Sequence, residues 1–130
     1  MTEPGMRIRV LIVDDHQIVR AGIRSVLESH QNVEVVGEAG DGKTAVLLVR
    51  ELRPDVVLMD ITLPRMSGIQ ATQEIKAEFP HVAIVGLSIH ESLEMVQAMT
   101  EAGGSVYLTK ETASDTLFPA IEAAFAACHN

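Results

Sequence analysis

Acidic side chains end two apolar segments of the sequence, and their grouping raises the possibility of a cation site. In "VLIVDDH" (residues 10–16), four apolar residues run directly into Asp14 and Asp15, and the similar run "DVVLMD" (55–60) ends in Asp60. Burying neighbouring carboxylates costs several kcal/mol per ion unless a positive charge offsets their repulsion. The pattern therefore indicates either a solvated turn or a site built for a cation.

Apolar runs of strand length alternate with amphipathic segments of helix length along the chain. The predicted strands are 8–13, 33–39, 55–60, 82–88 and 105–109. The predicted helices are 17–29, 42–52, 68–79, 91–102 and 114–127, with Ser67 as an N-cap. Such alternation, with near-continuous apolar strands, predicts a parallel sheet covered by helices on both faces. We expect a flavodoxin-like, doubly wound α/β fold with strand order 2-1-3-4-5 and five helices.

The strand ends of this fold bring together groups that suit phosphoryl chemistry. Sheets of this order bind ligands where the first and third strands meet, which places Asp14, Asp15 and Asp60 together. An all-oxygen cluster on short loops favours Mg²⁺. Ser88 ends the fourth predicted strand and Lys110 follows the fifth. Each has an ordinary structural role when taken alone, but together the acids, hydroxyl and ammonium outline a pocket for phosphoryl oxygens.

Pro119 conflicts with the helical pattern around it. Proline is tolerated in the first turn of a helix but not in its interior, because it lacks an amide hydrogen and clashes with the preceding turn. We therefore expect the last helix to begin nearer Leu117 or to be kinked.

Composition narrows the class of protein. With 130 residues and 47% hydrophobic content, the chain is expected to form one globular domain, with a tail at residues 1–6. The net charge of −8 argues against nucleic-acid binding by this chain, which needs clustered lysine and arginine. The single cysteine, Cys128, permits no internal disulfide, and no apolar run approaches the about 20 residues that span a bilayer. A soluble, cytoplasmic protein without membrane association is expected.

Four motifs in order resemble the receiver domain of response regulators in two-component signalling. They are "LIVDDH", "LMDITLPRMSG", "VGLS" and "VYLTK". The resemblance covers the chain from Arg7 to about Ala127, and "VDDHQIVRAGI" and "KETASDTLFPAI" are most similar to the NarL/LuxR-type subfamily. It implies the CheY-like version of the predicted fold.

The resemblance also implies the chemistry of the site. Asp60 would be the phosphoacceptor, taking a phosphoryl group from the phosphohistidine of a sensor histidine kinase or a phosphotransfer protein. Asp15 and Asp60 would bind Mg²⁺ directly, with Asp14 acting through water and the backbone carbonyl of Thr62 adding an oxygen. Such a protein is a signalling phosphoacceptor that catalyses only its own phosphorylation and dephosphorylation.

The same resemblance assigns a switch and an output. Lys110 would bind the phosphoryl group, Ser88 would move toward it, and Tyr107 would turn inward. The output surface would be the fourth helix, fifth strand and fifth helix, through which a homodimer is possible. NarL/LuxR-type proteins usually continue into a DNA-binding domain, whereas this chain stops at Asn130, so we expect no effector domain within it.

Three alternatives are weaker. A Mg²⁺-dependent phosphatase of the haloacid-dehalogenase type would need an Asp-x-Asp motif, but Ile61 and Thr62 follow Asp60. A nucleotide or flavin binder would need a phosphate-binding glycine loop, and "GEAGDG" (37–42) lacks that spacing. A receiver that only binds a partner, without being phosphorylated, is disfavoured because all five expected functional groups are present.

Overall fold

The protein is a single five-stranded parallel sheet with helices on both faces. The computed structural model describes residues 7–61, 63, 66–88, 93–104, 106–109 and 113–128, with only the backbone for 113–115. The strands are β1 Ile8–Val13, β2 Val33–Ala39, β3 Val56–Asp60, β4 Ala83–Ser88 and β5 Val106–Thr109. The helices are α1 Gln17–Glu28, α2 Gly42–Leu52, α3 Gly68–Glu78, α4 Leu93–Ala102 and α5 Ala113–Cys128. The order β2-β1-β3-β4-β5 confirms the predicted fold.

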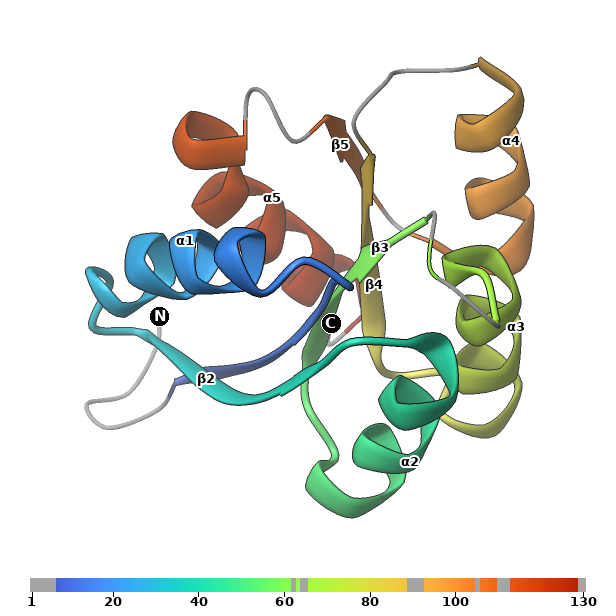
Figure 1. Cartoon of the computed structure of the whole chain (residues 1–130), viewed down its shortest axis with the longest axis horizontal. Coiled ribbons are helices and arrows are strands. Elements are labelled where there is room, and N and C mark those ends of the chain that lie inside the picture. The colour runs from blue at the N-terminus through green and yellow to red at the C-terminus, as the bar shows by residue number, and fades with distance from the viewer. Residues whose placement is uncertain are drawn as a thin grey trace.

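Helices cover both faces of the sheet (Figure 1), and a hydrophobic cluster lies on each face. Along β1, Leu11 and Val13 join the cluster under α2, α3 and α4, whereas Val10 and Ile12 join the cluster under α1 and α5. All four side chains are fully buried. Burial on both faces explains why the strands read as continuous apolar runs and not as alternating ones.

The start of α3 is fixed by a capping box. The hydroxyl of Ser67 accepts from the Gln70 amide, and the Gln70 side chain accepts from the Ser67 amide, both at 3.2 Å. These bonds satisfy amides that have no helical partner in the first turn. The predicted N-cap is confirmed, and it places the first turn of α3 directly after the loop that follows Asp60.

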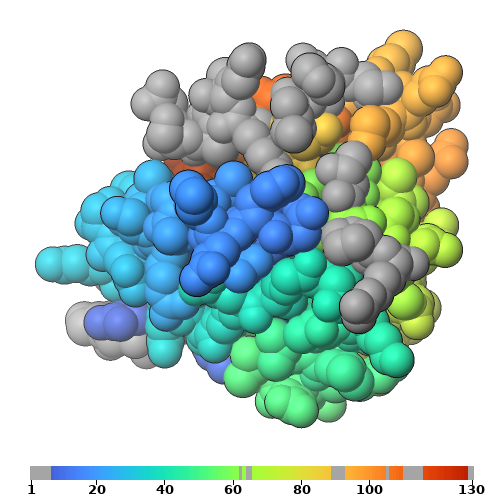
Figure 2. Space-filling model, viewed as in Figure 1, coloured from blue at the N-terminus to red at the C-terminus, as the bar shows by residue number. Residues whose placement is uncertain are grey.

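The loops at the carboxyl ends of β1 and β2 are neighbours. The amide of Asp14 donates to the carbonyl of Ala39 at 3.0 Å, which joins the two strand ends. In the space-filling view, the start of α1 (blue) adjoins the segment between β2 and α2 (teal) on one surface (Figure 2). Among the described residues, no helix combines the length and apolar character needed to cross a bilayer.

α5 starts at Ala113 and contains Pro119 in its interior, so the predicted helix over 114–127 is confirmed and the later start nearer Leu117 is wrong. The alternative expectation, a kink at Pro119, stays a prediction. Leu117, Ile121 and Ala124 are each at most 1% exposed and pack on the sheet. Pro119 itself lies on the exposed side. Burial of the apolar face therefore stabilises this turn of the helix despite the hydrogen bond that proline cannot make.

Replacing Pro119 with alanine is expected to stabilise the protein by about 1–3 kcal/mol. Alanine restores the amide hydrogen, and the gain is reduced because proline also restricts the unfolded chain. Urea unfolding followed by far-ultraviolet circular dichroism measures the change. Pro80→Ala is the matched control, because Pro80 lies beyond the end of α3 and its carbonyl, which accepts from Lys76 at 2.8 Å, is retained in alanine. The control should be neutral or slightly destabilised, and an equal gain in both variants would contradict the helical explanation.

Candidate functional site

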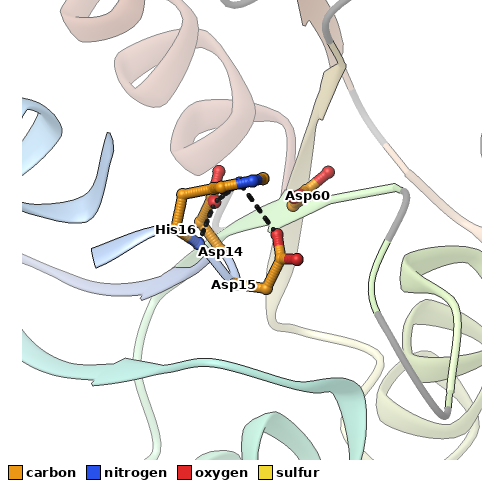
Figure 3. A group of neighbouring side chains, drawn as sticks. All are labelled: Asp14, Asp15, His16 and Asp60. Carbon is orange, nitrogen blue, oxygen red and sulfur yellow. Dashed lines mark hydrogen bonds and ion pairs between the residues drawn. The ribbon is translucent and has the colours of Figure 1, made fainter. Parts of the chain in front are cut away.

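Three carboxylates meet at the carboxyl ends of β1 and β3. Asp14 and Asp15 directly follow β1, Asp60 is the last residue of β3, and these two strands are paired neighbours. One oxygen from each acid and one ring nitrogen of His16 all lie within 4.8 Å of one another. Figure 3 shows Asp60 on β3 beside the group formed by Asp14, Asp15 and His16. The strand order thus produces the grouping that the sequence predicts.

The acids differ in their exposure to solvent. Asp14 is fully buried and Asp60 is 1% exposed, whereas the side chain of Asp15 is 31% exposed. The pocket therefore has two buried carboxylates and one at its mouth. Like charges held this close repel one another, and a bound cation relieves that repulsion.

The residues present fit Mg²⁺. This ion prefers oxygen ligands, uses a few carboxylates and retains several waters. Asp14, Asp15 and Asp60 offer carboxylate oxygens close together, and the partly exposed Asp15 leaves an open side for water. The ring nitrogen of His16 is a poorer donor for so hard an ion.

His16 has another task, which the sequence does not reveal. Its amide donates to Asp14 Oδ1 at 2.8 Å, and its ring Nδ1 lies 3.0 Å from Asp15 Oδ1 and 3.3 Å from Asp14 Oδ1. The turn after β1 is thus held partly by the buried acid itself. Arg20 is a second missed residue, since its Nη1 donates to the backbone carbonyl of Asp14. Neither its residue type nor its position in α1 indicates this contact in the sequence.

Ser88 lies on the strand beside the acids. It is the last residue of β4 and 3% exposed. Asp60 pairs with Leu87, so Ser88 stands one residue beyond the neighbour of Asp60 on the adjacent strand. This places a hydroxyl at the same edge of the sheet as the carboxylates.

Tyr107 lies on β5 with its side chain half-buried against the cluster under α3 and α4. It pairs with Gly86 on β4, and a Cβ added to Gly86 would lie 3.5 Å from Tyr107 Cδ2. The ring therefore packs over the space that the missing side chain of Gly86 leaves. The predicted site residues Lys110, which follows Thr109 of β5 in the chain, and Thr62 lie outside the described residues.

Gly68 is a further contributor that sequence reasoning missed. It is the first residue of α3, and its amide donates to the carbonyl of Ile61 at 2.9 Å. A Cβ on Gly68 would lie 2.1 Å from the carbonyl oxygen of Asp60 and 2.8 Å from Ile61 Cα. Only glycine lets the helix start this close to the backbone of Asp60, and a glycine after a cap residue gives no such indication in sequence.

Comparison with known proteins agrees with this geometry. The model of the response regulator receiver domain family matches residues 10–122. The chain is similar to the transcriptional regulatory protein DegU of Brevibacillus brevis, with 39% identity over 116 residues, covering 89% of this chain and 49% of DegU. It is 41% identical over 117 residues to the response regulator protein VraR of Staphylococcus epidermidis, covering 89% of this chain and 56% of VraR. The chain thus spans about half the length of these relatives.

Solved structures show the same arrangement of strands and helices. A LuxR-family two-component response regulator from Aurantimonas superposes with a TM-score of 0.89 at 40% identity, covering 93% of this chain and 86% of the other. The signal receiver domain of the response regulator NarL from Mycobacterium tuberculosis has a TM-score of 0.88 at 30% identity, covering 93% and 98%.

Proposed function

Because the chain belongs to the response regulator receiver domain family, with LuxR- and NarL-type relatives, we propose that it accepts a phosphoryl group on Asp60. The donor would be the phosphohistidine of a sensor histidine kinase or of a phosphotransfer protein. The observation that carries the proposal is the convergence of Asp14, Asp15 and Asp60 within 4.8 Å at the carboxyl ends of β1 and β3.

The transfer is a displacement at phosphorus. A carboxylate oxygen of Asp60 forms a bond to the phosphorus, the phosphorus–nitrogen bond of the donor breaks, and the departing imidazole takes up a proton. Asp15 and Asp60 would hold Mg²⁺ directly, Asp14 would act through water, and the carbonyl of Thr62 would complete the set. The bound ion supplies positive charge that offsets the carboxylates and the phosphoryl oxygens.

The remaining residues respond to the new charge on Asp60. The phosphoryl group adds negative charge and strong acceptor oxygens. Ser88 would donate its hydroxyl to one of these oxygens, and the ammonium of Lys110 would pair with another. Tyr107 would then turn further inward beside Gly86, changing the surface formed by α4, β5 and α5. This surface is the proposed output and the proposed site of homodimer formation.

The proposed role is a signalling switch and not a turnover enzyme. The curated relatives are transcriptional regulatory proteins, and the match to this chain covers about half the length of each. The domain would control an output domain or a partner protein, and its own surface would not bind nucleic acid. Its catalysis would be limited to its own phosphorylation and dephosphorylation.

Incubation with Mg²⁺ and acetyl phosphate, followed by intact mass measurement, tests the proposal. We expect one phosphoryl adduct on the wild-type protein and none on Asp60→Asn, because the amide oxygen is a poor nucleophile. Asp55→Asn is the matched control at the opposite end of β3, where Asp55 accepts from the Arg9 amide at 2.9 Å. It should be phosphorylated normally. An adduct that survives in Asp60→Asn, or no adduct on the wild type, would defeat the proposal.

Beryllofluoride provides an independent check. The isolated receiver domain of RcsB from Salmonella enterica, 30% identical to this chain, was solved in the presence of phosphomimetic BeF3−. We expect BeF3− to bind this domain only when Mg²⁺ is present and Asp60 is intact.

A further inference from the structure

A chain of alternating charges connects the outer face of α1 to the acidic pocket. Arg24 pairs with two acids. Its Nε lies 3.2 Å from Glu28 Oε2, and its Nη1 pairs with Glu38 on β2. Glu38 in turn accepts from Arg20 Nε at 3.0 Å. Arg20 then donates through Nη1 to the backbone carbonyl of Asp14. This series of charged side chains therefore ends at the backbone carbonyl of Asp14 and not at one of the carboxylates of the pocket.

The carbonyl of Asp14 is buried, and it belongs to the peptide that joins Asp14 to Asp15. Asp14 is fully buried and its amide is already used, donating to Ala39 at 3.0 Å. A buried carbonyl needs a donor, and β1 ends at Val13, so α1 supplies one from a side chain. The peptide that carries this carbonyl also carries the amide of Asp15. Its orientation therefore determines where the Asp15 carboxylate can point.

The guanidinium of Arg20 is held from its other side. The side chains of Arg20 and Glu38 are 19% and 29% exposed, so the pair is partly shielded from water. The hydrogen bond from Arg24 lowers the pKa of Glu38, which burial opposes and the bond from Arg20 reinforces. Glu38 stays ionised at neutral pH and anchors Arg20. A planar guanidinium can serve two fixed acceptors at once, which a lysine ammonium does less well.

We propose that Arg20 is a positioning residue of the phosphorylation site. By bridging Glu38 and the carbonyl of Asp14, it holds the peptide between Asp14 and Asp15 in the orientation that lets Asp15 bind Mg²⁺. The inference rests on the proposed function, because it assigns Arg20 a role in that metal site. It goes beyond that function by naming a residue that touches neither the metal nor the phosphoryl group.

Isothermal titration of Mg²⁺ into the variants tests this role. Removing outer partners of metal ligands weakens binding by about 10–100-fold, so we expect Arg20→Ala to raise the Kd for Mg²⁺ at least about tenfold. Arg20→Lys keeps the positive charge but not the planar guanidinium that reaches two acceptors, and it should recover only part of the Mg²⁺ affinity. Arg50→Ala is the matched control, since Arg50 forms an arginine–glutamate pair with Glu78 at 2.9 Å between α2 and α3. It should bind Mg²⁺ with the wild-type Kd.

Glu38 separates a relay through Arg20 from a general loss of stability. If Glu38 acts by anchoring Arg20, Glu38→Ala should weaken Mg²⁺ binding in the wild type but not in Arg20→Ala. Additive losses would indicate independent effects and overturn the relay. A Kd for Arg20→Ala within twofold of wild type, or full affinity in Arg20→Lys, would overturn the positioning role.

A second readout does not depend on the metal. In the metal-free protein, the carbonyl carbon shift of Asp14 and the amide nitrogen shift of Asp15 report on the hydrogen bond to this peptide. We expect both to move in Arg20→Ala and to stay in place in Arg50→Ala. Unchanged shifts would refute the contact even if Mg²⁺ binding were weakened. If the wild type binds no Mg²⁺, the proposed function fails, whereas failure confined to the Arg20 variants defeats only this inference.

Discussion

Replacing Gly68 with alanine is expected to lower the free energy of unfolding by about 3 kcal/mol. The added Cβ would lie 2.1 Å from the carbonyl oxygen of Asp60, 2.8 Å from Ile61 Cα and 2.9 Å from the carbonyl carbon of Asp60. All three are backbone atoms, so no side chain can rotate away to make room. The first turn of α3 or the end of β3 must shift, and urea unfolding measures the cost.

The matched control is the same substitution at Gly22. This glycine lies on the exposed side of α1, and a Cβ there would meet nothing within 4 Å. Gly22→Ala should therefore stabilise the protein by about 0.5–1 kcal/mol, because alanine favours helix. The two variants differ in the sign of their effect although the chemical change is identical. Equal effects in the two variants would show that the close approach to the Asp60 backbone is not the reason that position 68 needs glycine.

The same clash should also slow the phosphorylation of Asp60. Asp60 carries both the crowded carbonyl and the proposed nucleophile, so a shift of this backbone moves the carboxylate relative to Asp14 and Asp15. We expect Gly68→Ala protein that remains folded to be phosphorylated by acetyl phosphate about tenfold more slowly or worse. Gly22→Ala should retain the wild-type rate. A normal rate in folded Gly68→Ala would mean that the clash is absorbed by α3 alone.

The fold was predictable because apolar runs of strand length alternate with amphipathic helical segments along the sequence. Strands buried on both faces appear as apolar runs, as in "VLIV" of β1, and Ser67 reveals the start of α3 by its capping chemistry. The late helix start expected from Pro119 is wrong for the opposite reason. The local rule for proline predicted a late start or a kink, but Leu117 and Ile121 are buried on the sheet, and this tertiary packing outweighs the local cost of a proline inside the helix.

The site was predictable only where it depends on topology. Strand order brings Asp14 and Asp15 beside Asp60 whatever the details of the loops, so their convergence follows from the fold. Gly68 and Arg20 act through contacts with backbone carbonyls, and such contacts leave no mark in residue type or spacing. A glycine after a cap and an arginine on a helix are each common for other reasons, so only the three-dimensional arrangement identifies them.

Replacing Asp15 with asparagine is expected to remove most of the stabilisation that Mg²⁺ gives to the protein. A ligand at 100 times its Kd stabilises the folded state by about 2.7 kcal/mol. Asp15 is the proposed direct ligand at the pocket mouth, with its side chain 31% exposed, and asparagine removes its charge while keeping its shape. Thermal unfolding with and without Mg²⁺ should show a clear rise in Tm for the wild type and almost none for Asp15→Asn.

Asp55→Asn again provides the control, because this acid lies at the other end of the sheet and its contact with the Arg9 amide at 2.9 Å can be kept by an amide oxygen. Its Tm should rise with Mg²⁺ as the wild-type Tm does. Asp14→Asn should fall between the two variants, since its carboxylate is buried, accepts from the His16 amide at 2.8 Å and is proposed to act through water. A larger loss in Asp14→Asn than in Asp15→Asn would reverse these roles and make the buried acid the direct ligand. Because the readout is stability, it separates the metal site from the chemistry at Asp60.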